Sequence, residues 1–501
     1  MSQGLGDDEH VVKITIGEKF NRVTEKAKSL HSYARIYKVS EDLCKLNERA
    51  YIPRLVAIGP FHRNDTRLLK AMEDVKIPYA NRLFLRLNRG TADSETMDDQ
   101  KKDQVLQKCM EEMKTRKVRA KKYYKEEELT LLEKARKYYA EELKLSDDEM
   151  AEMMLVDGCF ILELLYVSYH TNFCQVQENG SRSNSKICEQ PRADPIFDNI
   201  LTDDTVKNDL MLLENQIPFF VLECLFELTV NQITGCPSGK LSLEDYVLSF
   251  FQEFLPNYRG SGSTKGTKHG KTKSGRPADD YYHILHLIHS RYIPEDQEEI
   301  NKIGGNRPKS TLHSELTLSA IDLHYAGVEF VPIEELSDVK FVNKGALCCC
   351  HTLEFQVPTI SICNATESFL RNVIALEQCS PGVPRYFTSY AKLMDMFINS
   401  EQDVQVLIKS KVIHNYLSTD KDVCDLFNKL CKEVVLKDFH FDEECQRASH
   451  YNMRWQTRVV RYVTRLFFAS PWPALAFSLG ILTFIITVYN FGYSIHKRLH
   501  H

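Results

Sequence analysis

The chain has 501 residues, of which 43% are hydrophobic and 27% are charged. This composition is typical of a folded globular protein, and it excludes a wholly disordered chain, a collagen and a multi-span membrane protein. The 64 basic and 69 acidic residues give a net charge of −5, so we expect no nucleic-acid partner.

The N-terminal part of the chain predicts a leader followed by helices. Residues 1–35 are expected to be a loose leader, and residues 36–450 are expected to form one large domain. Residues 97–145 are rich in Lys, Glu, Arg and Leu, which is typical of long helices with a solvated charged face. Prolines and a Gly-Pro pair divide residues 36–87 into a loop and short helices: Pro53, Gly59-Pro60 and Pro78.

Helix starts and one helix break can be located from side-chain chemistry. Pro218 lies within residues 209–228 and cannot donate to the preceding turn, so residues 215–217 are expected to join two helices. Four hydroxyl residues precede a carboxylate at capping-box spacing: Ser146 with Glu149, Ser242 with Asp245, Ser400 with Asp403 and Thr419 with Asp422.

A small sheet is expected in the second half of the chain. Residues 328–362 alternate apolar and polar positions and carry β-branched and aromatic residues, a pattern that favours strands. Residues 258–278 are rich in Gly, Ser, Lys and Thr and predict an exposed, mobile, basic loop. The expected fold is therefore an α-rich, mainly helical globular domain with a small β-sheet near residues 325–362.

The C-terminus predicts one transmembrane helix. No charged residue occurs in residues 466–495, and the apolar segment 474–494 would span about 30 Å as a helix, the thickness of a hydrocarbon core. An Arg-rich juxtamembrane segment, 451–473, precedes it and a short tail, 495–501, follows it. A buried core helix is the alternative, but the segment is terminal and apolar on all sides. The lipid bilayer is therefore an expected partner.

The distribution of basic residues favours one orientation in the membrane. Four arginines precede the apolar segment, whereas only Lys497 and Arg498 follow it together with three histidines. The positive-inside rule then places the large domain in the cytosol, with insertion after translation, in a plasma membrane or endomembrane. The opposite topology stays open. The arginines are Arg454, Arg458, Arg461 and Arg465.

Cysteines and glycosylation sequons bear on the same question. The fifteen cysteines are an odd number and are too sparse for a disulfide scaffold, so reduced thiols in a cytosolic domain are expected. The run 348–350 consists of three cysteines, for which a short strand is favoured over acylation or metal binding. Asn64, Asn179 and Asn364 begin Asn-x-Ser/Thr triplets, which would matter only in the secretory lumen.

Searches for catalytic, cofactor and metal sites give no assignment. The segment 266–272 resembles a P-loop but has three residues between its glycines instead of four, and GxSxG and HExxH motifs are absent. His283, His286 and His289 are spaced for a helix with polar edges rather than for one metal ion. We therefore predict no catalytic residue, no cofactor and no metal ligand.

Three carboxylates lie in apolar surroundings and support the alternative of an uncharacterised enzyme. Asp157 and Glu163 lie in VDGCFILELL, and Glu214 lies in LLENQIPFF. Such acids can be perturbed general acids or bases. We favour structural anchors that bond helix ends and backbone N–H groups. The basic residues between Lys265 and Arg276 are expected to be a solvated linker, with contact to acidic lipid headgroups as the alternative.

Several blocks together resemble the plant family of domain of unknown function 247. They include YIPRLVAIGPFHR with LLKAMEDVKIPY (51–79), EMMLVDGCFILELL (152–165), the stretch 194–228, ATESFLRNVIALEQC (365–379) and the stretch 389–434. The final order of an Arg-rich segment, SPWP and an apolar span is similar too. The long basic loop and the cysteine triplet depart from the family pattern.

The resemblance implies a single-pass membrane protein with a C-terminal anchor and no established catalytic residues. Some grass members of the family are associated with the pollen side of self-incompatibility. We therefore expect a non-enzymatic recognition or signalling protein that presents loops 172–192 and 258–278 to a protein or peptide partner. A membrane-tethered scaffold is a further alternative.

Overall fold

The structure is a computed structural model of the whole chain. It describes residues 33–87, 99–122, 125–178, 194–233, 241–254, 281–293, 318–345, 351–453, 459 and 471–499. The chain divides into two compact units. Unit 1 comprises residues 1–295, 364–387 and 432–435, and unit 2 comprises residues 296–363, 388–431 and 436–501.

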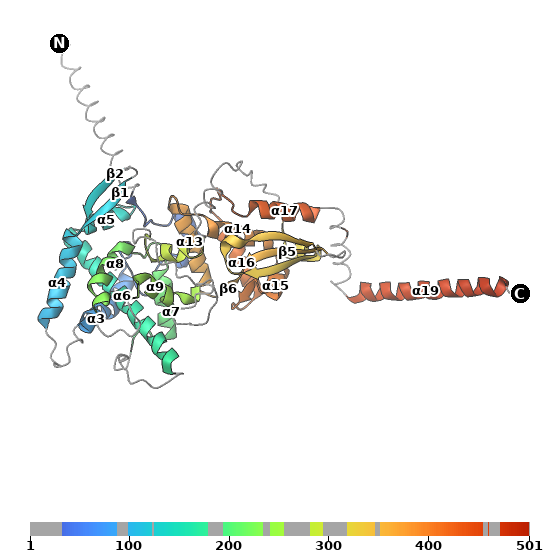
Figure 1. Cartoon of the computed structure of the whole chain (residues 1–501), viewed down its shortest axis with the longest axis horizontal. Helices are drawn as coiled ribbons and strands as arrows, with labels where there is room; N and C mark the ends of the chain where they lie inside the picture. Colours follow the sequence, from blue (N-terminus) through green and yellow to red (C-terminus); the bar gives the residue numbers. More distant parts are fainter. Residues whose placement is uncertain are drawn as a thin grey trace, which may run out of the picture. The chain divides into compact units, whose positions relative to one another are not determined.

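Unit 1 is built around one long helix, α6 (Asp147–Glu178). From Met153 to Ser168 every residue of α6 except Val156 is buried, because helices pack around it. The packed helices are α3 (Thr66–Leu87), α4 (Asp99–Thr115), α8 (Phe219–Leu228) and α9 (Leu243–Phe250), which Figure 1 shows grouped about α6. The other helices of unit 1 are α2 (Glu41–Leu46), α5 (Leu131–Tyr138), α7 (Ile200–Leu210), α10 (Ile284–Ser290) and α13 (Thr366–Cys379).

Unit 2 contains the sheet that the sequence predicts. Strands β3 (Val328–Ile333), β5 (His351–Pro358) and β4 (Lys340–Gly345) lie in the order β3-β5-β4, with β3 parallel and β4 antiparallel to β5. Phe355 on β5 and Phe397 are fully buried, and their ring centroids are 5.0 Å apart in an edge-to-face arrangement. The expected strand region is therefore confirmed.

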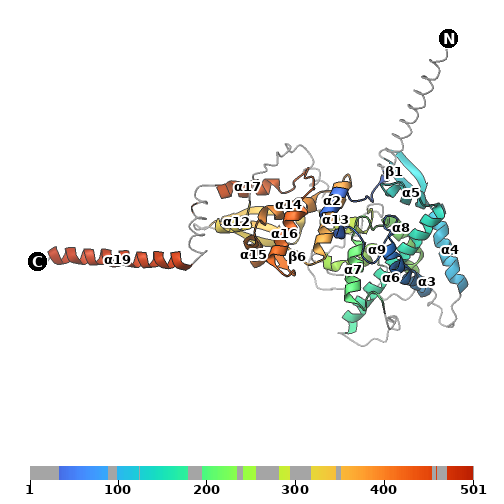
Figure 2. The same ribbon diagram turned by 180° about the vertical axis from the view of Figure 1, so that it is seen from behind.

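Further helices and two further strands complete unit 2. Helix α12 packs on β3 and α15, and α17 packs on β4. Figure 2 shows these three helices from behind. The elements are α12 (Ala320–Tyr325), α14 (Tyr386–Phe397, from Thr388 onward), α15 (Glu401–Lys409), α16 (Asp420–Leu430), α17 (Asp442–Met453), β6 (Ile360–Ile362), β7 (Ile413–Asn415) and α19 (Pro471–Leu499). The expected α-rich fold with a small sheet is thus confirmed.

The four predicted helix starts are also confirmed. Ser146, Ser242, Ser400 and Thr419 directly precede α6, α9, α15 and α16, and in each case the carboxylate three residues later accepts the backbone N–H of the capping residue. Pro218 is the N-cap of α8 and follows a turn after α7, so the predicted joint is present.

Two local predictions were wrong. Residues 117–130 form an antiparallel hairpin of β1 (Lys117–Lys122) and β2 (Lys125–Thr130) instead of a helix. Its register places the basic strand β1 opposite the acidic strand β2, and Lys117 Nζ lies 3.4 Å from Glu128 Oε2. Opposite charges across a strand pair contribute to its stability. Pro78 lies inside the continuous helix α3 and does not end it.

Some predictions fall partly or wholly outside the described residues. Loop 258–278, the cysteine run 348–350, Asn179 and the four juxtamembrane arginines are outside them, as is most of the 1–35 leader. Residues 172–178 of the expected loop 172–192 continue α6, and the structure describes nothing between residues 179 and 193. The single domain of residues 36–450 stays a prediction.

Candidate functional site

Helix α7 and the turn that follows it hold a loop of the N-terminal region, α7 through a buried carboxylate. Asp209 is 2% exposed, and its carboxylate accepts the backbone N–H groups of Arg54, Leu55 and Val56 at 2.9, 2.7 and 2.9 Å. Burial raises the pKa of Asp209 to about 6, although the three N–H groups favour the charged form. Val56 is buried, so its N–H in particular needs this acceptor inside the protein.

Asn215 and Gln216 extend the same arrangement. The Asn215 side chain accepts the N–H of Ile58 at 2.6 Å and donates to the carbonyl of Val56 at 2.9 Å. The Gln216 amide donates to the carbonyl oxygens of Leu210 and Leu212, which closes the turn on itself. The Asn215 side chain therefore fixes the loop to the turn, and the Gln216 side chain fixes the shape of the turn itself.

Gly59 lies where the loop approaches the turn most closely. Its N–H donates to Asp157 Oδ2 at 2.7 Å, and its φ of +73° is a left-handed conformation. A Cβ atom at this position would lie 2.6 Å from the carbonyl oxygen of Gln216. Only glycine fits this backbone geometry without displacing the turn.

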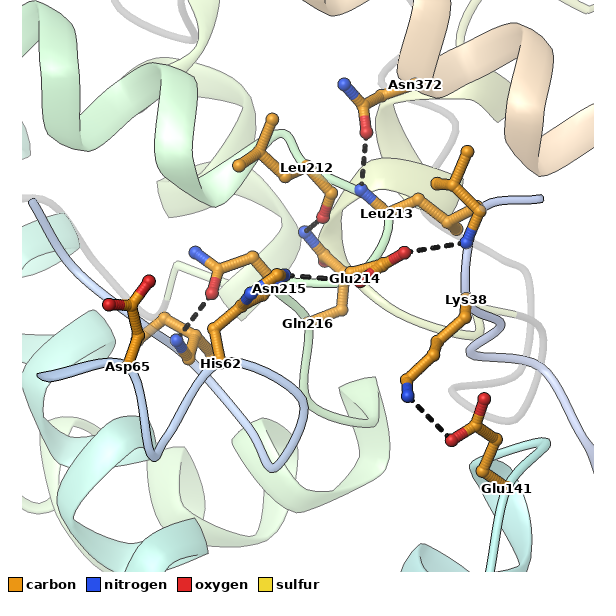
Figure 3. A network of polar contacts seen from close by, with 12 residues as sticks. Lys38, His62, Asp65, Glu141, Leu212, Leu213, Glu214, Asn215, Gln216 and Asn372 are labelled. Carbon is orange, nitrogen blue, oxygen red and sulfur yellow. Dashed lines mark hydrogen bonds and ion pairs between the residues drawn. The ribbon is translucent and has the colours of Figure 1, made fainter. Parts of the chain in front are cut away.

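Glu214 links this turn to the segment before α2. Its Oε1 accepts the N–H of Val39 at 2.7 Å, and its Oε2 lies 3.3 Å from Nε2 of His62. Figure 3 shows Glu214 between these two segments, at the turn that also carries Asn215 and Gln216. Both side chains of the pair are mostly buried, with 14% of His62 and 12% of Glu214 exposed.

Charged side chains of α3 meet carboxylates of α6 and of the segment before α7. Lys76 pairs with Asp157, and Arg86 pairs with Glu163, whose carboxylate is fully buried. Burial raises the pKa of Glu163, and the Arg86 guanidinium opposes that rise. Arg82 lies 2.9 Å from Asp194 and 3.7 Å from Glu163, so it contacts two acids.

The three carboxylates predicted from the sequence are therefore each held by donors of the protein. Asp157 bonds a backbone N–H and a lysine, Glu214 bonds a backbone N–H and faces a histidine, and Glu163 bonds arginine. Glu163 differs from the expected anchor because its partners are side chains. Chemically, these groups can fix helices and a loop in place. Sequence reasoning missed Asp194 and Asp209, although both lie in the block 194–228.

The three spaced histidines do not form one site. His283 is the N-cap of α10 and accepts the N–H of His286, while His289 Nε2 lies 2.8 Å from Glu377 Oε1. His283 and His289 are fully buried and so do not form an exposed polar edge. Within the described ranges, no group of three or more His, Cys, Asp or Glu side chains is placed to hold a metal ion.

Asp209→Asn should destabilise the protein strongly. An amide would direct an N–H₂ donor at backbone N–H groups that need an acceptor, at a cost of about 2–4 kcal/mol. The exposed Asp204 of the same helix provides the matched control, and Asp204→Asn should change the free energy of unfolding by less than about 0.5 kcal/mol. Urea unfolding of the detergent-solubilised chain, followed by circular dichroism, compares them. Equal effects would contradict the anchoring role.

Gly59→Ala should also destabilise, because it combines backbone strain with a clash against a carbonyl oxygen. Gly382 has a φ of +86° and open space around its Cβ position, so Gly382→Ala tests strain alone, at about 1–2 kcal/mol. We expect Gly59→Ala to cost at least about 1 kcal/mol more than that. The same urea unfolding measurement compares the two variants. A smaller loss of unfolding free energy for Gly59→Ala would show that the turn moves aside at little cost.

The buried His283 should make stability fall in acid. Burial lowers the pKa of His283 to about 3, whereas an unfolded histidine titrates near about 6.5. The unfolded state therefore binds the proton first as pH falls, and His283 contributes a loss of about 2 kcal/mol between roughly pH 8 and 5. His283→Asn keeps a capping acceptor and should reduce this pH dependence, while the exposed control His414→Asn should not. The measurement is the free energy of unfolding of the wild type and both variants at pH 8 and pH 5. An unchanged pH dependence in His283→Asn would contradict the prediction.

Comparisons with known proteins identify the family of the chain. A family model described as a plant protein of unknown function matches residues 36–486. A UPF0481 protein of Arabidopsis thaliana is 25% identical over 470 residues, which cover 90% of this chain and 84% of that protein. A putative UPF0481 protein of the same plant is 30% identical over 195 residues, 38% of this chain and 35% of that relative. No solved structure matches the chain. The chain belongs to the plant family of domain of unknown function 247.

Proposed function

We propose that this protein is a membrane-anchored, non-enzymatic recognition or signalling protein of a plant. The observation that carries the proposal is the surface of α19, where residues 475–496 form a helix long and apolar enough to cross a membrane, and none of it is buried within the protein. A soluble protein would leave this surface in water at a large cost. The lipid bilayer is the partner that removes it from water.

The polar groups along α19 are compatible with a lipid environment. Thr483 donates its hydroxyl to the carbonyl of Gly480 at 2.9 Å, and Thr487 donates to Thr483 at 2.8 Å. These bonds satisfy the hydroxyl groups within the helix, so they need no water. Trp472 near the start and Tyr489 and Tyr493 near the end suit the two membrane interfaces.

The non-enzymatic part of the proposal is supported by the use of the buried acids. Asp157, Glu163 and Glu214 all bond backbone donors or basic side chains, and each has a structural role in unit 1. These bonds hold a loop and two helices in place, which supports a structural use of the three acids. The partner we propose is a protein or peptide. The specific version of the proposal, suggested by the family resemblance, is a pollen-side determinant of self-incompatibility.

We further propose that the large domain faces the cytosol of a plasma membrane or endomembrane. The described cysteines form no disulfide with one another, which is compatible with this side. Asn64 and Asn364 are exposed, so both sequons would be open to glycosylation if the domain were in the secretory lumen. Treatment with a glycosidase should leave the electrophoretic mobility of the native protein unchanged. A mobility shift would show that the large domain lies in the secretory lumen.

Alkaline carbonate extraction of plant microsomes tests the anchor. The full chain should stay in the membrane pellet, whereas the double variant Leu482→Arg with Ile485→Arg should move to the supernatant. Each arginine near the middle of the helix costs about 2.5–3.5 kcal/mol of insertion free energy. Thr483→Ala in the same turn is the control and should stay in the pellet. If the full chain were extracted like the double variant, membrane attachment through α19 would be refuted.

A further inference from the structure

Helix α7 presents an apolar pair to solvent at its first turn. Ile200 and Leu201 are 80% and 76% exposed, more than any other large apolar side chain of the described residues, α19 included. They begin a helix whose N-cap, Asn199, accepts the N–H of Leu201 at 3.0 Å. First-turn positions usually carry polar residues, so an exposed Ile-Leu pair there needs an explanation beyond helix formation.

Acidic side chains border this pair. Asp198 and Asp204 are exposed, and Asp204 follows Ile200 by four residues and Leu201 by three, so it lies on the same helix face. Its carboxylate makes no ion pair with any residue that the structure describes, whereas Asp203 pairs with Lys207 at 2.9 Å. Ile200, Leu201, Asp198 and Asp204 together form what we call the α7 patch.

The opposite face of α7 holds the patch in a fixed position. Val206 and Leu210 are buried in the core of unit 1, and Asp209 bonds three N–H groups of the loop 54–56. A patch on a fixed helix loses little conformational entropy when a partner binds. A partner would therefore bind to an apolar surface that is already formed before binding.

We infer that the α7 patch binds a basic amphipathic segment of a protein partner, with apolar side chains on Ile200 and Leu201 and Lys or Arg beside Asp198 and Asp204. This inference rests on the proposed recognition function and names the chemistry of the partner. A second copy fits less well, because the acids of two patches would face each other. An acidic lipid surface would be repelled for the same reason.

The test uses the full chain in nanodiscs of uncharged lipid. The probe is a fluorescent peptide of about 14 residues with Leu on one helical face and Lys on the other. We expect Ile200→Ser with Leu201→Ser to raise the Kd about tenfold or more. Asp198→Asn with Asp204→Asn should raise it several-fold and weaken its salt dependence. The matched control is Ile77→Ser on α3, an apolar residue of the same unit that is 56% exposed, and it should leave the Kd unchanged.

Several results would overturn the inference. The Kd could be equal for the wild type and the double serine variant, the Ile77→Ser control could weaken binding as much, or the same peptide with Glu in place of Lys could bind as tightly. Self-association of the wild type that is lost in the double serine variant would assign the patch to a second copy instead. Membrane attachment through α19 is measured separately, so a failure of the patch is distinguishable from a failure of the anchored recognition function.

Discussion

Backbone N–H groups in a buried loop need acceptors, and this requirement shapes unit 1. The loop 54–59 enters the core without forming a helix or strand, so its donors cannot be satisfied by regular secondary structure. Asp209, Asn215 and Asp157 supply the acceptors from two other segments. The close approach of Gly59 to Gln216 accompanies this attachment.

Buried polar groups find their partners in two different ways in this protein. In unit 1, buried acids are compensated by N–H groups, lysine or arginine, because a charge in a core is stable only with partners. In α19 the helix satisfies its own backbone, and two threonine hydroxyls bond to it as well. A helix of this kind needs no polar partner along its length, which is the condition that a hydrocarbon environment imposes.

Much of this structure could be predicted from sequence because the signals were local. Capping residues, the joint before Pro218 and the alternation in β3, β4 and β5 each depend on neighbours in the chain. The β1–β2 hairpin could not be recognised, because the charges that face each other across its strands, such as Lys117 and Glu128, also suit a solvated helix. Pro78 in α3 was misjudged because the helix is held by packing on α6. The anchor residues were partly foreseen, but Asp194 and Asp209 act through segments more than a hundred residues away.

The pairs between α3 and α6 have a consequence for how unit 1 can vary. Lys76 and Arg86 come from one helix, and Asp157 and Glu163 come from another. Replacing either member of such a pair by a neutral residue leaves the other ionised in the interior, while replacing both by apolar residues of similar volume removes the problem. Natural variants of this protein should therefore exchange these positions two at a time, and a chimera that joins α3 of one relative to α6 of another should fold only when the charges still match.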